Sequence, residues 1–422
     1  MRIVGLCRTP SFLVFVAFIL VMIDGYDMFI VSFVAPLVAH DLHLASNNLG
    51  AVFAAGLAGS MLGGLALGAV ADRVGRRPVL IGAILFAGIM TILCSEATSF
   101  GRFALLRFLT GFGLGGLLAA VVPLIAEYFL PERRSQAVTS MFIGYPLGAV
   151  VGGIVTAVLI AYGWRDLFVG TGTVTLLLLP FTLLLKETAA SKIDKQDHDG
   201  EDRVLGTKFS ILELFTEGRL WTTLTTSFGI FCLLLLTYLL NSWTPLIAVK
   251  LGFKPQTAAL CGVFLNLGGI VGALSSMLWV RQVGVFRLAA LMVSVGSLGI
   301  AAIGFAAHAA SSLFLALFVS GVLVIGAQQN APAMSVQLYP RRMRATGAGW
   351  QFAAGRLGSI LGPLIGGILF SSGIAYETLF LLMTVPALLA GAAYARVHYL
   401  LRPRTSSASD STTKTLEKGV LP

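Results

Sequence analysis

Twelve long apolar segments run through the chain and leave few folds open to it. Each is long enough to supply the roughly 20 residues that a helix needs to cross a bilayer. Period-2 alternation of polar and apolar residues, which is typical of membrane-spanning strands, is absent. The sequence therefore predicts an all-α integral membrane protein with twelve transmembrane helices. The segments lie at 11–38, 48–71, 79–100, 103–129, 136–161, 166–186, 220–249, 257–280, 286–307, 311–338, 345–372 and 376–400.

The composition agrees with this interpretation. Of 422 residues, 57% are hydrophobic and 11% are charged, whereas an ordinary soluble domain is about 25% charged. A soluble chain of this length could not cover its hydrophobic cores with so few charged side chains. The net charge of +10 comes from basic residues that recur at the ends of the apolar segments and not in one patch. We therefore expect a lipid bilayer, and no nucleic acid, as a partner.

The distribution of Lys and Arg predicts the topology. If both termini lie in the cytoplasm, 23 of the 29 Lys and Arg residues fall on the cytoplasmic side, as the positive-inside rule requires. The first segment follows Arg2 and Arg8, as the core of a signal peptide would, but it is longer than such a core and contains two acids. We expect it to remain in place as the first transmembrane helix.

The two halves of the chain look like copies. Pro123 and Pro131, with two arginines following, recur as Pro332 and Pro340 at an offset of 209 residues, and a row of glycines in the fifth segment recurs in the eleventh at an offset of 214. Such repeats predict two pseudo-symmetric six-helix bundles with a central site at their interface. The expected domains are an N-terminal bundle at 1–186, a solvated cytoplasmic linker at 187–219, a C-terminal bundle at 220–400 and a disordered cytoplasmic tail at 401–422.

Four charged residues of these segments are expected to lie within the bilayer: Asp24, Asp27, Arg107 and Arg356. An ionised side chain at the bilayer centre costs about 2.5–3.5 kcal/mol, so it persists beside a partner or in a wet pathway. The two acids are three residues apart and project from nearly one helix face. We expect Asp27 to pair with Arg107, either as a purely structural salt bridge or as part of a working site. A structural pair leaves Asp24 unexplained, so we interpret Asp24, Asp27 and Arg107 as a proton-coupling site.

Several strings carry a family resemblance. "GAVADRVGRR" at 68–77 and "RFLTGFGLG" at 107–115 resemble signature motifs of the major facilitator superfamily. "DGYD" at 24–27, "YLLNSWTPLI" at 238–247 and the stretch 339–367 resemble the superfamily's aromatic acid:proton symporter family. The sequence departs from that family at "WTP", where the family has Trp-Leu-Pro or Trp-Val-Pro, which leaves the identity of the substrate open.

The resemblance implies the major facilitator fold and a function. It implies a proton-coupled secondary transporter that imports a small aromatic carboxylate, of the benzoate, hydroxybenzoate, phenylpropionate or aryloxy-acid type, by alternating access across the bacterial inner membrane. We expect a monomer that is not an enzyme and has no cofactor. A proton-driven exporter of drugs or metabolites and a non-transporting membrane sensor are the alternatives. The exporter's usual fifth-helix Gly-Pro pair is absent, and no signalling domain or catalytic constellation is evident.

The expected substrate-binding residues lie in the C-terminal half. Arg356 offers a planar fork of donors that suits a carboxylate, with Asp24 or Asp27 as its alternative partner. Trp243 is equally compatible with an interfacial anchor, and the polar side chains with contacts between helices. The full predicted set is Arg356, Asn241, Trp243, Gln328, Gln329 and Asn330.

A charged cluster is expected at the cytoplasmic ends of the helices. Tight turning at Gly75 brings acid and base together there, and the superfamily resemblance implies that this cluster locks the outward-open state. The predicted gating residues are Asp72, Arg73, Arg76, Glu127 and Arg344.

No metal site is expected. Cys7, Cys94, Cys232 and Cys261 are scattered with no short spacing, and we interpret them as reduced packing residues. The segment "HDLH" at 40–43 lacks further ligands nearby and reads as an outer loop.

Overall fold

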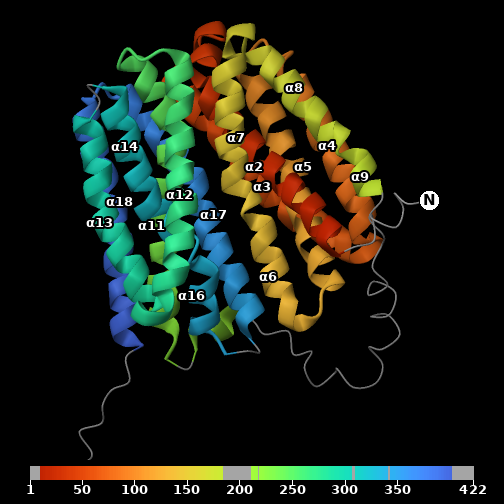
Figure 1. Cartoon of the computed structure of the whole chain (residues 1–422), viewed down its shortest axis with the longest axis vertical. Coiled ribbons are helices and arrows are strands. Elements are labelled where there is room, and N and C mark those ends of the chain that lie inside the picture. Colours follow the sequence, from red (N-terminus) through yellow and green to blue (C-terminus); the bar gives the residue numbers. More distant parts are fainter. Residues whose placement is uncertain (1–9, 184–210, 217, 307–308, 341–342, 402–422) are drawn as a thin grey trace, which may run out of the picture.

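A computed structural model describes residues 10–183, 211–216, 218–306, 309–340 and 343–401 (Figure 1). Twelve helices in these ranges are long and apolar enough to cross a membrane. The prediction of twelve transmembrane helices is thus confirmed. Cys7, most of the expected linker and nearly all of the expected tail lie outside the described residues.

The first six membrane segments form the N-terminal bundle. The fifth segment is split into α6 and α7, and the sixth into α8 and α9. The elements are α2 (Pro10–Asp41), α3 (Ser46–Val74), α4 (Arg76–Cys94), α5 (Phe100–Tyr128), α6 (Pro131–Phe142), α7 (Gly144–Leu159), the 3₁₀ turn η1 (Ile160–Tyr162), α8 (Trp164–Leu177) and α9 (Leu179–Leu183).

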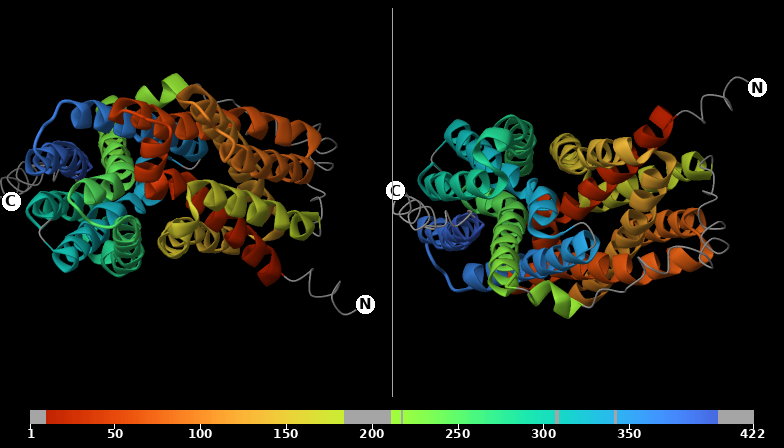
Figure 2. Two further views of the ribbon diagram at one scale, coloured as in Figure 1. Left: turned by 90° about the horizontal axis from the view of Figure 1, so that it is seen from above. Right: turned by 90° about the horizontal axis from the view of Figure 1, so that it is seen from below.

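The last six membrane segments form the C-terminal bundle, which lies beside the first when the molecule is seen along the helices (Figure 2). Its elements are the 3₁₀ helix η4 (Ile211–Phe215), α11 (Leu220–Lys250), α12 (Pro255–Val283), α13 (Val285–Phe305), α14 (Ala310–Ser320), the π-helix η5 (Gly321–Ile325), α15 (Gly326–Gln328), α16 (Ala331–Leu338), α17 (Arg344–Ser371) and α18 (Tyr376–Leu400). We call the end at which α2 and α11 begin the inner end, because the basic residues predict that it faces the cytoplasm.

The repeated glycines have the same role in both bundles. A Cβ at Gly148 of α7 would clash with the carbonyl oxygen of Met22 in α2. A Cβ at Gly362 of α17 would likewise clash with the carbonyl oxygen of Leu235 in α11. Only glycine permits such close backbone contact between helices. The fifth helix therefore packs on the first as the eleventh packs on the seventh.

The tenth membrane segment is interrupted, whereas the sequence indicated one continuous helix over 311–338. The turn at Gly321–Ile325 is a π-helix, and Gln329 and Asn330 leave the helical pattern before α16 begins. Pro332 lies in the first turn of α16 and has no N–H to donate to the carbonyl four residues earlier. The break therefore interrupts the backbone hydrogen bonding of the tenth membrane segment in its inner part, at Gln329 and Asn330.

The end of the expected linker belongs to the C-terminal bundle. Leu214 is fully buried, and its carbonyl accepts a hydrogen bond from Thr223 at 3.0 Å. Phe215 packs edge-on against Trp350, with ring centroids 5.3 Å apart. Leu214 and Phe215, which fall within the expected linker, thus pack against α11 and α17.

The two bundles are in close contact toward the outer end. A Cβ at Gly50 of α3 would lie 2.7 Å from the carbonyl oxygen of Pro363 in α17. Ser371 donates a hydrogen bond of 2.6 Å to Asn47, and Gly153 of α7 lies against Val263 of α12. These contacts close the outer end of the interface between the bundles.

Candidate functional site

Hydrogen bonds to its side chain and backbone fix the position of Asp27. Its carboxylate accepts hydrogen bonds from Arg107 at 3.1 Å and from Thr91 at 3.0 Å. The same guanidinium donates to the backbone carbonyl of Asp27 at 2.8 Å. Both charged side chains are 2% exposed, and Arg107 also lies over the ring of Phe168. The expected Asp27–Arg107 pair is present, and it joins α2 to α5 inside the N-terminal bundle.

Asp24 is as buried as Asp27 but has no such partners. It is 1% exposed, and neither carboxylate oxygen has a hydrogen-bond partner among the described residues. Its electrostatic neighbours are Asp27 and, from the other bundle, Arg356. A buried carboxylate without a donor is costly in its charged form. The two acids of α2 therefore differ in their surroundings, since Asp27 is paired and Asp24 has no hydrogen-bond partner among the described residues.

Arg356 comes from the middle of α17 and is partly buried. Its guanidinium lies 4.9 Å from the ring centroid of Phe352, one turn earlier on the same helix. Within the part of the chain that the structure describes, no acid lies within ion-pair distance of it. The structure thus places Arg356 in electrostatic range of Asp24 without a salt bridge between them, and the alternative of a direct ion pair with Asp24 or Asp27 is wrong for this conformation.

Two tyrosines, which the sequence reasoning did not single out, connect the bundles next to these charges. The hydroxyls of Tyr145 in α7 and Tyr238 in α11 lie 3.1 Å apart. Phe29 packs against both rings, with centroids 5.9 and 6.0 Å away. Arg356 and Asp24 both act electrostatically on Tyr145. The aromatic pair and the charges together form the candidate site at the bundle interface.

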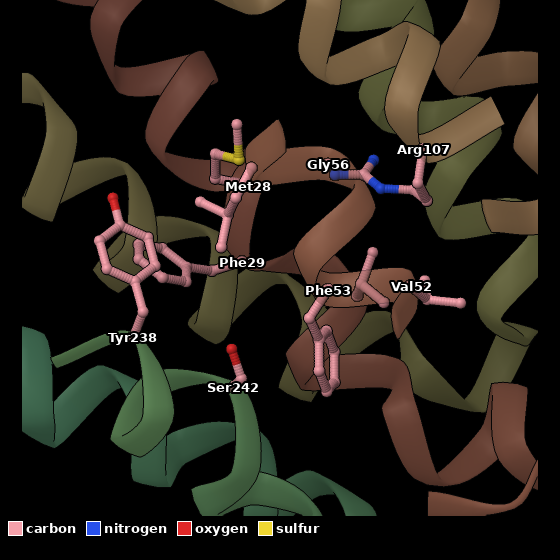
Figure 3. Close-up of a pocket in the computed structure, with 10 residues that line it drawn as sticks. Met28, Phe29, Val52, Phe53, Gly56, Arg107, Tyr238 and Ser242 are labelled. Atoms are coloured by element: carbon pink, nitrogen blue, oxygen red, sulfur yellow. The ribbon is translucent and has the colours of Figure 1, made fainter. Parts of the chain in front are cut away.

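A small cavity lies on the outer side of this site (Figure 3). Phe29 and Tyr238 border one part of it, Arg107 lies across from them, and the hydroxyl of Ser242 faces it from α11. Its volume is about 10 Å³, room for about one water molecule. An aromatic acid does not fit there, so the site is closed toward the outer end.

A larger groove of about 460 Å³ lies elsewhere, within the N-terminal bundle. Its walls come from α2, α7 and α8, and its lining includes Tyr26, Gly152 and Thr171 among aliphatic side chains. None of the four membrane-buried charges lines it. The groove is therefore separate from the candidate site.

The side chain of Asn241 forms hydrogen bonds within the C-terminal bundle. Its side-chain oxygen accepts a hydrogen bond of 2.7 Å from Asn266 in α12, and its amide donates to the carbonyl of Thr237 at 2.9 Å. The contact between helices, one of the two interpretations of this side chain, is thus the one observed.

Trp243 lies outward of the candidate site. It is fully buried, which excludes the interfacial anchor, and its indole N–H donates to the carbonyl of Pro363 at 3.1 Å. Its ring stacks on Phe370 at 4.6 Å and meets Phe53 of the other bundle edge-on. The structure therefore places Trp243 in the outer contact between the bundles and not beside Arg356.

The three amides of the tenth helix differ from one another. Gln329 is exposed at the helix break, and Oε1 of Gln328 is buried without a hydrogen-bond partner among the described residues. Asn330 accepts a hydrogen bond of 3.4 Å from the hydroxyl of Ser276 and donates one of 3.4 Å to the carbonyl of Gly326. Gln328 and Gln329 therefore remain available for a ligand, while Asn330 serves contacts within the bundle.

The charged cluster at the inner end is formed within the N-terminal bundle. Arg76 pairs with Glu127 of α5 and, more loosely at 3.9 Å, with Asp72. Gly75 between α3 and α4 has a φ of 115°, which glycine adopts easily. Arg73 is exposed, and Arg344 donates to the carbonyl of Tyr339 at 3.2 Å in the other bundle. The structure thus joins three of the five predicted gating residues and places Arg344 apart from them.

The described cysteines are buried and free. They are Cys94, Cys232 and Cys261. Within the described ranges, no group of three or more His, Cys, Asp or Glu side chains is arranged to hold a metal ion.

Comparison with known proteins adds to this geometry. The Major Facilitator Superfamily profile matches residues 17–329 and 273–422. The chain is 31% identical to the 4-hydroxybenzoate transporter PcaK of Acinetobacter baylyi, over 90% of both proteins, and 32% identical to a gallate transporter of Pseudomonas putida, over 89% of both. A crystal structure of a bacterial homologue of the human lysosomal transporter Spinster, inward-facing and occupied, superposes with a TM-score of 0.73 at 17% identity, covering 93% of this chain and 98% of that one.

The fold, the motifs and these relatives agree. The chain is a multi-pass membrane protein with the fold of membrane transporters. It belongs to the major facilitator superfamily, and its relatives agree with the aromatic acid:proton symporter family within it.

Proposed function

We propose that this protein is a proton-coupled symporter that imports small aromatic carboxylates by alternating access. One observation carries the proposal: among the described residues, buried Asp24 has no hydrogen-bond partner, and Arg356 of the opposite bundle acts on it electrostatically. In this proposal Asp24 is the proton carrier and Arg356 is the cation that binds the substrate anion. Two relatives are transporters of 4-hydroxybenzoate and of gallate, which supports an aromatic acid as the substrate.

The two acids of the first helix have different roles in this proposal. Asp27 has a structural role, because its carboxylate is already bound by Arg107 and Thr91. Asp24 carries the transported proton, because no fixed donor stabilises its anion. The ion pair therefore fixes the position of α2, and Asp24 does the proton exchange.

Arg356 binds the substrate carboxylate. Its planar guanidinium suits a carboxylate bidentately, and no acid of the described ranges lies within ion-pair distance of it. With a substrate anion on Arg356, an ionised Asp24 would be a second anion beside one cation. The protonated form of Asp24 avoids this repulsion. Binding of the substrate then favours binding of the proton, and the reverse follows by reciprocity.

Gln328 and Gln329 contribute to recognition of the ring substituents. Oε1 of Gln328 lacks a donor, and Gln329 is exposed where the tenth helix is broken. Interrupted helices tend to line the binding cavities of transporters.

Opening and closing take place at both ends of the interface. The contact of Gly50 with Pro363 and the hydrogen bond between Asn47 and Ser371 close the outer end in this conformation. In the outward-open state, the cluster of Asp72, Arg76 and Glu127 secures the inner end.

We place the protein in the bacterial inner membrane as a monomer, with both termini in the cytoplasm. The 23 of 29 basic residues on one side support this orientation. Its activity is transport and not chemical conversion of the substrate.

Uptake into proteoliposomes tests the proposal. We expect radiolabelled 4-hydroxybenzoate to accumulate only when the outside is more acidic than the inside, and to equilibrate without accumulation after a protonophore is added. Accumulation that is indifferent to the protonophore would contradict proton coupling. Accumulation under an inverted gradient would indicate export.

A further inference from the structure

The hydrogen bond between Tyr145 and Tyr238 leaves one hydroxyl hydrogen without an acceptor. Each tyrosine hydroxyl has one hydrogen to donate and lone pairs to accept with. The bond between the two hydroxyls uses one hydrogen, and in the described part of the chain neither hydroxyl has another partner. The pair therefore offers one donor and several acceptor positions at the bundle interface.

The pair lies about one helical turn outward of Arg356. Gly355, next to Arg356, packs against Leu234 of α11, and Tyr238 is four residues further toward the outer end of the same helix. Ile360, four residues after Arg356, packs with Tyr238 in one apolar cluster. One turn is about 5.4 Å, comparable to the span of a benzene ring with its para hydroxyl. A carboxylate on Arg356 thus places the far side of its ring near the two hydroxyls.

The side chains around the pair are apolar and include an aromatic ring. Phe29 packs against both tyrosines, and Leu234 and Ile360 border the same cluster. On the outer side, the cavity holds about 10 Å³, so a substrate cannot extend past the pair. The outermost atom of the bound ligand therefore meets the hydroxyls.

We propose that the hydroxyl pair of Tyr145 and Tyr238 is a specificity determinant that recognises a ring hydroxyl of the substrate. This inference rests on the proposed function and goes beyond it by naming phenolic acids as the preferred class over unsubstituted benzoate. A phenolic hydroxyl donates and accepts, as the pair does, so it completes the unsatisfied donor. Because the tyrosines come from opposite bundles, a bound hydroxyl also bridges the two.

The expected preference is modest. A site whose polar groups are left unpaired by the wrong substrate rejects that substrate strongly. Here the two hydroxyls partly satisfy each other when no ligand is present. One added hydrogen bond then gives a preference of about fivefold, which corresponds to about 1 kcal/mol.

Equilibrium binding by the purified protein tests this inference. The dissociation constants of 4-hydroxybenzoate and benzoate are measured for wild type, Tyr145→Phe, Tyr238→Phe and the double variant. We expect the preference for 4-hydroxybenzoate over benzoate, taken as the ratio of the two dissociation constants, to fall about fivefold in the double variant. Tyr394→Phe is the matched control, because its buried hydroxyl has no partner and lies in α18. It should leave the preference unchanged.

Two outcomes would overturn the inference: equal wild-type affinity for both acids, or an unchanged preference in a folded double variant. If the double variant does not fold, the single variants decide, since each must lower the preference measurably. The proposed function fails differently, through uptake that ignores the proton gradient while the binding preference still depends on the tyrosines.

Discussion

Arg107 binds Asp27 at two points, at its carboxylate over 3.1 Å and at its backbone carbonyl over 2.8 Å. This double contact makes Asp27 a fixed part of the N-terminal bundle. Asp24, three residues earlier on the same helix, is equally buried and has no hydrogen-bond partner in the described structure. Two acids that look equivalent in the sequence thus differ in their hydrogen-bond partners.

Replacing Asp27 should destabilise the protein. Asp27→Asn leaves the Arg107 charge buried without its counter-ion, and breaking a buried pair in this way costs about 3–5 kcal/mol. Asp41→Asn is the control, since Asp41 pairs with Arg165 at the exposed outer end, where such pairs contribute about 1 kcal/mol or less. Thermal unfolding in detergent measures both variants. Equal stability of the two would contradict a fixed structural role for Asp27.

Replacing Asp24 should uncouple transport and leave folding intact. The carboxylate of Asp24 has no hydrogen-bond partner to lose, and Asn keeps its shape without a titratable proton. We expect Asp24→Asn to exchange labelled for unlabelled aromatic acid across the membrane but to lose accumulation driven by a proton gradient. Both activities are measured in the same proteoliposomes. Normal accumulation by this variant would show that another group carries the proton.

A side chain at Gly50 should oppose closure of the outer end. Its Cβ would meet the backbone oxygen of Pro363, which cannot move aside as a side chain can. In a background whose native cysteines are replaced, Val52→Cys reports access to the small outer cavity. We expect Gly50→Ala to increase its labelling by a membrane-impermeant maleimide.

The control for this experiment is Gly101→Ala. Gly101 is exposed on α5, and a Cβ there meets nothing within 4 Å. This variant should label like the parent. If Gly50→Ala also labelled like the parent, the contact between α3 and α17 would not be the outer closure.

Substitutions in the inner cluster of Asp72, Arg76 and Glu127 should affect protein stability and transport rate to different extents. Glu127 is 22% exposed in its pair with Arg76, whereas Asp72 is 73% exposed and lies 3.9 Å from the same guanidinium. Asp72→Asn should therefore change stability by less than about 0.5 kcal/mol, as exposed pairs do, and still slow transport if Asp72 secures the inner end in the other state. Glu127→Gln should lower both stability and rate. Unaltered transport by Asp72→Asn would remove Asp72 from the gate.

The sequence predicted the parts of the structure that depend on local pattern. Twelve apolar segments of sufficient length allowed few other folds, and charges inside them needed partners, which indicated the pair of Asp27 with Arg107. The motif residues Asp72 and Arg76 were likewise recognisable as a string, and turning at Gly75 brings them together.

Apart from the charged pair of Asp27 with Arg107, contacts between residues that lie far apart in the chain were not visible in the sequence. Trp243 donates a hydrogen bond to the carbonyl of Pro363, and Asn241 accepts one from Asn266. No rule of residue spacing indicates either contact. The pair of Tyr145 with Tyr238 was missed for the same reason, because single tyrosines in apolar segments are ordinary. Pro332 was visible in the sequence and could have indicated the break in the tenth helix.

The central claim is that Asp24 takes up a proton when an aromatic acid binds at Arg356. Isothermal titration calorimetry of 4-hydroxybenzoate binding, repeated near neutral pH in buffers of different ionisation enthalpy, counts the protons taken up with the ligand. The account predicts that wild type takes up a substantial fraction of one proton for each ligand bound and that Asp24→Asn takes up none while still binding. It also predicts much weaker binding by Arg356→Lys. Equal proton uptake by wild type and Asp24→Asn would contradict the account.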